Sequence, residues 1–285
     1  MSNPVPVVRT VEELRAQVAA WRAEGLRVGL VPTMGALHHG HLSLVDAIAE
    51  KADRIVVSIF VNPTQFGEGE DFDAYPRTEQ EDRQKLGSTP ASLVFAPNAA
   101  EMYRKGHASK VTVSGISDRL EGAERPGHFD GVATVVTKLL LQCLPDVAIF
   151  GEKDYQQLAV IRRFVADLDI PVEIMAGKLI REEDGLAASS RNAYLNSNER
   201  AIAGQFNKIL KTLVQNAEGD IPLRDAEQRA TNALLDAGFR AVDYVSIVDS
   251  NSLELLDKLD RPARVLAVAR IGKVRLLDNM PVGAQ

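Results

Sequence analysis

The first 180 residues alternate between short apolar runs typical of buried strands and longer stretches in which apolar residues recur at helical spacing. Parallel strands need a crossover between them, and a helix usually supplies it, so this alternation favours a parallel sheet with helices on both faces. We therefore predict an α/β fold, a Rossmann-like doubly wound parallel sheet. The expected strands are Val28–Val31, Ile55–Val61, Ser92–Phe95, Val147–Phe150 and Val172–Ala176, and the expected helices are Leu42–Ala52, Thr78–Leu86, Gly131–Leu144 and Tyr155–Leu168.

The pattern changes near residue 180, where two helical stretches are followed by three strand-like runs. Helices grouped before strands are typical of an α+β arrangement. We predict a Rossmann-like domain over residues 1–178 and a smaller α+β C-terminal domain over residues 179–285. The expected helices of the second domain are Asn198–Gln215 and Leu223–Ala237, and its expected strands are Ala241–Val248, Arg264–Ile271 and Lys273–Leu277.

The overall charge and the single cysteine narrow the class of protein. A formal charge of −6 and a pI near 5.5 argue against a broad nucleic-acid-binding surface. Cys143 alone cannot form an intrachain disulfide, which fits a reducing, cytoplasmic setting. The N-terminal residues lack the apolar core of a secretory signal, and the most apolar run, Val132–Leu144, is too short to span a bilayer. We expect no membrane partner.

The segment Pro32–His41 joins the first expected strand to the first expected helix through a glycine-bearing turn. Such turns present backbone N–H groups and the positive end of a helix dipole to an anion. His38 and His41, three residues apart, fall on one side of the first helical turn and could hold a phosphate chain. A capping or surface role is the ordinary alternative for one histidine. Zinc is disfavoured, because the pair lacks i, i+4 spacing and a cysteine cluster.

Two further polar groups also follow expected strands, at the edge of a parallel sheet where ligands bind. Asn62 and Gln65 offer carboxamides that donate and accept hydrogen bonds together, although Asn-Pro is also a common turn. Gly151–Asp154 combines a glycine that permits close approach, a lysine for phosphate, and an aspartate that could cap a helix or bind a ribose hydroxyl. We predict one composite site at this edge.

Three more segments have competing interpretations. Ser189, Ser190 and Arg191 form a run of donors suited to a departing pyrophosphate, although a solvated serine-rich loop is the commoner meaning. The stretch Arg125–Gly131 precedes a helix and fits either a lid or a turn. The acidic run of Glu79, Glu81 and Asp82 predicts a solvated helix face.

Taken in order, the motifs resemble those of a known family. Pro32–His41 resembles the signature of the nucleotidylyltransferase superfamily related to class I tRNA synthetases. Together with Phe60–Phe66, Arg125–Phe129, Phe150–Asp154 and Ser189–Asn192, it resembles the pantothenate synthetase (pantoate–β-alanine ligase) family over about residues 28–280. Two departures are Ala188, where the family usually has Met or Leu, and Glu121, where cysteine is frequent.

The resemblance implies ATP-dependent condensation of (R)-pantoate with β-alanine, giving (R)-pantothenate, AMP and pyrophosphate through a pantoyl adenylate. It also implies Mg²⁺ accompanying ATP and a homodimer, and no residue is assigned to a metal. The first predicted domain would then bind nucleotide and pantoate, and the smaller C-terminal domain would serve as a lid. The catalytic residues that it implies are His41, His38, Lys153 and Arg191. Those implied for pantoate and β-alanine are Gln65, Gln157 and Asn62. Those implied for ATP are Met34, Gly35, Ala36, Leu37, His38, His39, Gly40, His41, Gly151, Glu152, Lys153, Asp154, Ile180, Ala188, Ser189, Ser190 and Arg191.

Two rival functions compete with this interpretation. An adenylyltransferase that releases its product would accept a phosphate group, whereas Asn62, Gln65 and Gln157 favour a neutral or singly charged acceptor. A nucleotide sensor without catalysis would need no donors for a leaving group, and the run Ser189–Arg191 argues against it. An assay of nucleotide turnover distinguishes the ligase from the adenylyltransferase and from the sensor.

Overall fold

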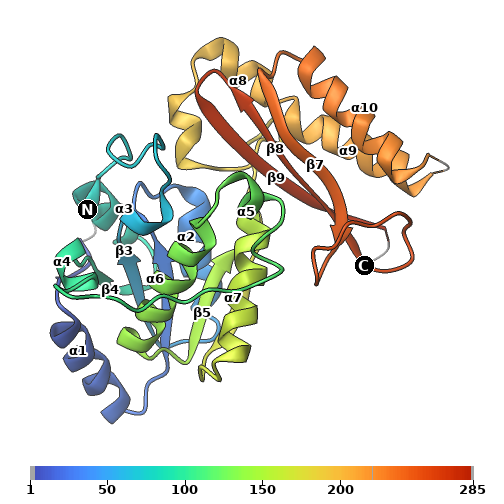
Figure 1. The fold of residues 1–285 in the computed structure, drawn as a ribbon. Coiled ribbons are helices and arrows are strands. Elements are labelled where there is room, and N and C mark those ends of the chain that lie inside the picture. The colour runs from blue at the N-terminus through green and yellow to red at the C-terminus, as the bar shows by residue number, and fades with distance from the viewer. Residues whose placement is uncertain (1–3, 220, 284–285) are drawn as a thin grey trace. The chain divides into compact units, whose positions relative to one another are not determined.

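The computed structural model describes residues 4–219 and 221–283. By its internal contacts the chain forms two compact units (Figure 1). The first extends to Glu152 and resumes from Gln157 to Lys178, and the second comprises Lys153–Gln156 and the chain from Leu179 onward. In the described ranges, no helix combines the length and the apolar character needed to cross a membrane.

The first unit is built on a six-stranded parallel sheet in the order β1-β4-β3-β2-β5-β6, which confirms the predicted α/β class. The strand β2 lies in the interior of the sheet, with Leu30 opposite Val56 of β3 and Ala148 of β5. The strands are β1 (Val7–Val8), β2 (Val28–Thr33), β3 (Arg54–Ile59), β4 (Ala91–Phe95), β5 (Val147–Gly151) and β6 (Glu173–Gly177).

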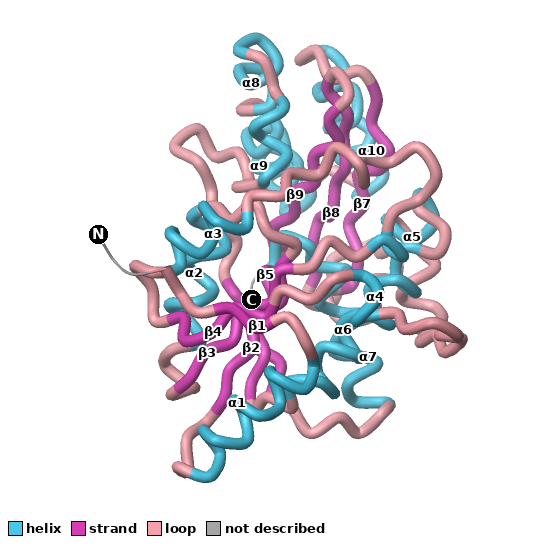
Figure 2. Tube along the Cα trace, turned by 90° about the vertical axis from the view of Figure 1, so that its left-hand side faces the viewer, coloured by secondary structure: helices cyan, strands magenta, loops and turns pink. Residues whose placement is uncertain are grey.

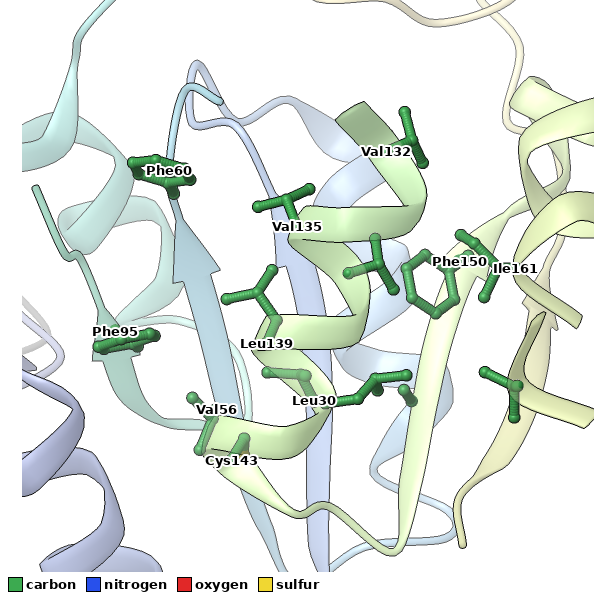
Figure 3. Close-up of a cluster of buried hydrophobic side chains, with 14 of the residues drawn as sticks. Leu30, Val56, Phe60, Phe95, Val132, Val135, Leu139, Cys143, Phe150 and Ile161 are labelled. Carbon is green, nitrogen blue, oxygen red and sulfur yellow. The ribbon is translucent and has the colours of Figure 1, made fainter. Parts of the chain in front are cut away.

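Successive strand residues face opposite sides of this sheet, and each side has its own hydrophobic core. One core packs the strands against helices α1 (Val11–Ala23), α6 (His128–Cys143) and α7 (Tyr155–Asp167). Figure 3 shows part of it, with side chains of α6 directed at those of the sheet. The other core packs the strands against α2 (His39–Ile48) and α3 (Glu79–Leu86). Strand residues therefore alternate between two buried faces, which is why the strands read as continuous apolar runs.

Helix α2 begins three residues before the expected start at Leu42. The reason is local: the side chain of His38 takes the N-cap position and accepts a hydrogen bond from the backbone N–H of Gly40. Strand β3 ends at Ile59, two residues early, because Asn62 caps a 3-10 turn, η1 (Pro63–Gln65). Both polar motifs thus shape the ends of the elements that carry them.

The second unit contains an antiparallel sheet of β7 (Ala241–Asp249), β8 (Ala263–Ile271) and β9 (Val274–Val282), in that order (Figure 2). Helices α9 (Phe206–Glu218) and α10 (Leu223–Asp236) share one hydrophobic core with these strands. The expected single helix over Asn198–Gln215 is wrong. The structure has α8 (Ser197–Ala203) and then α9, separated at Gly204, where an added Cβ would lie 2.4 Å from a carboxylate oxygen of Asp184.

Candidate active site

The site of the first unit lies where the chain changes direction across the sheet. From β2 the chain proceeds to β3 on one side, and it returns later to β5 on the other side. Ligands of open α/β sheets bind at the carboxyl ends of the strands at such a point. The segment Pro32–His41 and Gly151 leave β2 and β5 at this edge. A Cβ built on Gly151 would meet no heavy atom within 4 Å, so the backbone there is open to close approach.

His38 and His41 are brought together at the start of α2, with ring centroids 4.1 Å apart. The Nδ1 atom of His38 accepts from the backbone N–H of Gly40 at 3.1 Å, and the Nδ1 atom of His41 accepts from that of His38 at 3.3 Å. A histidine nitrogen that accepts a hydrogen bond carries no proton, so the neutral rings hold theirs on Nε2. The pair thus has two oriented N–H donors. His39 is exposed, with its ring edge toward His38.

The turn before α2 does not offer its own amides to a ligand in the way expected. The backbone N–H groups of Ala36 and Leu37 both donate to the carboxylate of Asp82, at 2.9 and 2.8 Å. The conformation is demanding, since Gly35 has a φ of +82° and Ala36 has +50°. The N–H of Gly35 donates to Thr33. An anion at this turn would therefore meet the imidazole rings before these three amides.

The prediction that Asp82 belongs to a solvated helix face is wrong, because the residue is fully buried. It lies on α3 four residues before the buried Leu86, and i, i+4 residues share one face of a helix. Lys85, on the same helix, donates its Nζ to the carbonyl of Leu37 at 2.8 Å. Helix α3 thus holds the turn in two ways: Asp82 accepts from backbone N–H groups of the turn, and Lys85 donates to one of its backbone carbonyls. The spacing from Asp82 to Leu86 was the sequence signal for this burial.

Asn62 has its side chain almost entirely buried and fully engaged. Its Nδ2 donates to Gln65 Oε1 and to the carbonyl of Gly131, both at 3.1 Å. Its Oδ1 accepts from Thr64 and from the hydroxyl of Tyr103, the latter at 2.7 Å. Because both ends of the amide are occupied, Asn62 orients Gln65 in this structure.

Gln65 joins the two polar segments of the first unit. Its Nε2 donates to the sulfur of Met34 at 3.1 Å, so the residues predicted for pantoate and for adenine touch here. Gln157, the third residue expected to hold pantoate, is half-buried in the first turn of α7.

The segment Arg125–Gly131, left open as a lid or a turn, braces η1 from the start of α6. The guanidinium of Arg125 contacts both carboxylate oxygens of Glu70 at 2.6 Å, and Glu121 at 3.1 Å. His128 donates from Nδ1 to the carbonyl of Gln65 at 2.8 Å, and its Nε2 faces Arg125 at 3.2 Å. Burial and the neighbouring Arg125 charge lower the pKa of His128 below its usual value of 6.5.

Glu121 and Glu70 are the acidic partners in this brace. The Glu121 carboxylate, at the position where the related family often has cysteine, is buried and paired with Arg125. Burial of Glu70 disfavours its charged form, but the hydrogen bonds and charge of Arg125 outweigh that effect and lower the pKa of Glu70. Both carboxylates therefore neutralise Arg125 beside the backbone of Gln65.

In the second unit, the segment carrying Lys153 and Asp154 is anchored to the antiparallel sheet. The carbonyl of Lys153 accepts from Asn279 Nδ2 at 2.9 Å, and the Tyr155 hydroxyl donates to the carbonyl of Ser250 at 2.8 Å. The ammonium of Lys153, partly exposed, lies 3.4 Å from Asp154. Glu152, the residue before this segment, belongs to the first unit.

The loop of the second unit that carries the serine–arginine run is also organised by its own contacts. Ala188 donates its backbone N–H to the carbonyl of Ile180 at 3.0 Å, so these two expected ATP-binding positions are paired. The Ser189 hydroxyl caps the 3-10 turn η3 (Ser190–Tyr194) by accepting from the N–H of Arg191. Arg181, at the start of the loop, forms a two-pronged ion pair with the buried Asp278 at 2.7 and 2.8 Å.

Among the residues that the structure describes, no three His, Cys, Asp or Glu side chains gather as a metal-binding cluster. Of the predicted residues, the first unit pairs His38 with His41, and it brings Met34 and Asn62 into contact with Gln65. The second unit groups Lys153 with Asp154, and Ile180 with Ala188 and the run Ser189–Arg191. The sequence reasoning missed the supporting residues Asp82, Tyr103, Asp278 and Asn279.

Comparisons with known proteins give one consistent result. A family model described as Pantoate-beta-alanine ligase matches residues 6–281. The chain is 59% identical over 99% of both chains to the pantothenate synthetase of Paramagnetospirillum magneticum. It is 53% identical over 98% of both chains to that of Chelativorans sp..

Solved structures agree. The pantothenate synthetase of Thermus thermophilus is 44% identical, with a TM-score of 0.90 over 97% of this chain and 99% of that one. The pantoate-beta-alanine ligase of Francisella tularensis, solved with beta-gamma ATP and beta-alanine, is 33% identical, with a TM-score of 0.83 over 97% of each chain.

Proposed function

The chain belongs to the pantoate-beta-alanine ligase family, as its five motifs predicted, and we propose how its residues divide the work of that reaction. The enzyme condenses (R)-pantoate with β-alanine at the expense of ATP, giving (R)-pantothenate, AMP and pyrophosphate. The carboxylate of pantoate first attacks the α-phosphate of ATP and displaces pyrophosphate. The amine of β-alanine then attacks the acyl carbon of the pantoyl adenylate and displaces AMP.

The first step needs no general base. A carboxylic acid with a pKa of about 4 is already ionised at neutral pH. The barrier lies in bringing two anions into line and in stabilising the charge that grows on the phosphates. Oriented N–H donors and fixed cations meet both needs, and the proposed groups are of these kinds.

In the first unit, we assign the Nε2–H groups of His38 and His41 to the phosphates of ATP. The observation that carries this assignment is that each Nδ1 is already held by a backbone N–H, so both rings are oriented before a ligand arrives. Gln65, oriented by Asn62, is assigned to pantoate together with Gln157. The backbone around Met34 is assigned to adenine.

In the second unit, Lys153, Ser189, Ser190 and Arg191 are assigned to the phosphates. Asp154, with Gly151 of the first unit, is assigned to the ribose. Ile180 and Ala188, paired through their backbones, are assigned to adenine. We propose that this unit, residues 179–285 by the sequence division, acts as a lid that keeps water from the adenylate until the amine arrives.

Mg²⁺, a homodimer and a cytoplasmic setting follow from the family resemblance as proposals. Mg²⁺ would neutralise charge on the phosphates of ATP. In sites of this class the substrate phosphates and water supply most of its ligands, and the cationic side chains proposed here complement such an ion rather than coordinate it.

The test is release of pyrophosphate and AMP from MgATP, first with pantoate alone and then with β-alanine added. We expect a burst of pyrophosphate near one equivalent with pantoate, which becomes sustained turnover with β-alanine. His41→Ala should slow pyrophosphate release by about 10²–10³, the typical loss for one preorganised donor. His107→Ala, at an exposed histidine that is assigned to no substrate, is the matched control. Pyrophosphate release that does not depend on pantoate would overturn the proposal.

A further inference from the structure

Two neighbouring polar residues are buried in the last strand of the second unit. Asp278 and Asn279 are each 3% exposed and follow one another in β9, an edge strand. Neighbouring strand residues point to opposite faces, so the two side chains have different surroundings. Burial of polar groups is costly unless they are hydrogen-bonded, so their partners indicate what they are for.

Asp278 and the backbone of Asn279 hold the beginning of the serine–arginine loop. The guanidinium of Arg181 donates to both Asp278 oxygens and, at 3.2 Å, to the carbonyl of Asn279. The same guanidinium donates to the carbonyl of Gly185 at 2.9 Å, which closes the turn inside the loop. These contacts of Arg181 therefore hold the loop that carries Ser189, Ser190 and Arg191.

The side chain of Asn279 holds the second segment. Its Nδ2 donates to the carbonyl of Lys153, 126 residues earlier in the chain. Its Oδ1 accepts from Arg264, a diagonal neighbour on β8. The guanidinium of Arg264 in turn lies 4.0 Å from the ring centre of Tyr155, two residues after Lys153. These contacts hold the backbone carbonyl of Lys153 and the ring of Tyr155 that follows it.

We propose that Asn279 is a positioning residue that fixes the backbone of Lys153 for binding the phosphates of ATP. This inference rests on the proposed assignment of Lys153 to those phosphates. Lysine is a point charge on a flexible stem, so its placement depends on its backbone more than that of a planar arginine would. All of the contacts lie within the second unit, so one strand sets the lysine relative to the serine–arginine loop.

The first test replaces Asn279 in two ways. Asn279→Asp is nearly isosteric and keeps an acceptor for Arg264, but it puts an oxygen opposite the carbonyl of Lys153. Asn279→Ala removes the side-chain contacts with Lys153 and Arg264 without burying a charge. If the aspartate variant does not fold, the alanine variant tests the positioning role. Asn232→Asp, the same change at an exposed position on α10, is the matched control.

We expect both Asn279 variants to lower kcat/KM for ATP by about 10- to 100-fold, the range for a misplaced catalytic group. KM for pantoate should change less than twofold, and Asn232→Asp should match the wild type. In a Lys153→Ala background the Asn279 changes should cost little more, because the two residues act through one contact. Full multiplication of the two losses would overturn the proposal.

A readout independent of activity separates failure of this inference from failure of the proposed function. Amide hydrogen exchange in the peptide over residues 150–158 should be faster in Asn279→Ala than in the wild type. If the wild type lacks pantoate-dependent pyrophosphate release, the proposed function fails and the exchange result still decides whether Asn279 holds Lys153. Unchanged exchange together with wild-type ATP kinetics would show that Asn279 has no positioning role.

Discussion

The two polar loops assigned to ATP are each held by one buried aspartate, but through different chemistry. In the first unit, Asp82 accepts from two neutral backbone amides of the turn before α2. In the second unit, Asp278 accepts from the charged guanidinium of Arg181. Asp82 thus fixes the backbone itself, whereas Asp278 fixes the loop through a side chain at its start.

Because of this difference, removing the two aspartates should lower the free energy of unfolding by different amounts. Loss of Asp82 would leave two amides without their acceptor. The buried amide of Leu37 would then cost about 1–3 kcal/mol, whereas water can reach the partly exposed Ala36. Loss of Asp278 would leave a cation without its counter-charge, which is typically worth about 3–5 kcal/mol for a fully buried pair. The Arg181 side chain is 25% exposed, so water recovers part of that cost. The ion pair should still be the more damaging loss for overall stability.

The largest effect is expected from Asp278→Ala. We expect the second unit to be destabilised by about 3 kcal/mol, because Arg181 would remain largely buried and unpaired. Urea unfolding, followed by a probe in each unit, would measure it. Asp260→Ala removes a carboxylate from an exposed ion pair and serves as the control. A double variant in which Arg181 is also replaced by Met should recover part of the loss. If it does not, the ion pair is not the cause.

Asp82→Ala should have a smaller effect on stability and a clearer one on catalysis. We expect about 2 kcal/mol of destabilisation from the orphaned amides of Ala36 and Leu37. The turn before α2 would also relax, so pyrophosphate release should slow. Glu81→Gln, on the exposed neighbour, is the matched control. Thermal unfolding and the burst assay together would check both effects. An unchanged burst would show that the hydrogen bonds from the turn to Asp82 do not matter for the placement of His38 and His41.

The smallest expected effect is the contribution of histidine to the pH dependence of stability, which belongs to the first unit. All five histidines of the chain lie before residue 152, so the second unit has no group of this type. Burial, and then the charge of Arg125, lower the pKa of His128. The unfolded chain therefore gains a proton near pH 6.5 while the native chain resists it, and stability falls as the pH drops below about 6.5.

Protonation of His128 would also place an N–H at Nε2, opposite the guanidinium of Arg125. The resulting repulsion would weaken the contacts that hold the backbone of Gln65. We expect His128→Gln to flatten the decline in unfolding free energy between pH 7 and pH 5.5. His107→Gln, at an exposed histidine, should retain it. Equal slopes in both variants would locate the pH dependence elsewhere.

The contacts around Asn62 show why the predicted site is incomplete. Its position after β3 was predictable, because strand and turn signals are local. That its amide is also consumed by Gly131 and Tyr103 was not predictable, since those partners come from separate elements. The helix expected over Asn198–Gln215 also failed, since the structure divides this stretch into α8 and α9 after Ala203.

The sequence alone determined the parallel sheet, five of its six strands and the polar segments at the ends of those strands. Period-two and period-3.6 patterns and strand-terminal motifs are written in adjacent residues, so these features needed no tertiary information. Only the tertiary structure decided which buried groups hold those segments: Asp82 on the turn before α2, and Asp278 and Asn279 on the loops of the second unit. Their partners in those segments lie between 45 and 126 residues away, and a hydrogen bond at that separation exists only once the whole unit has folded.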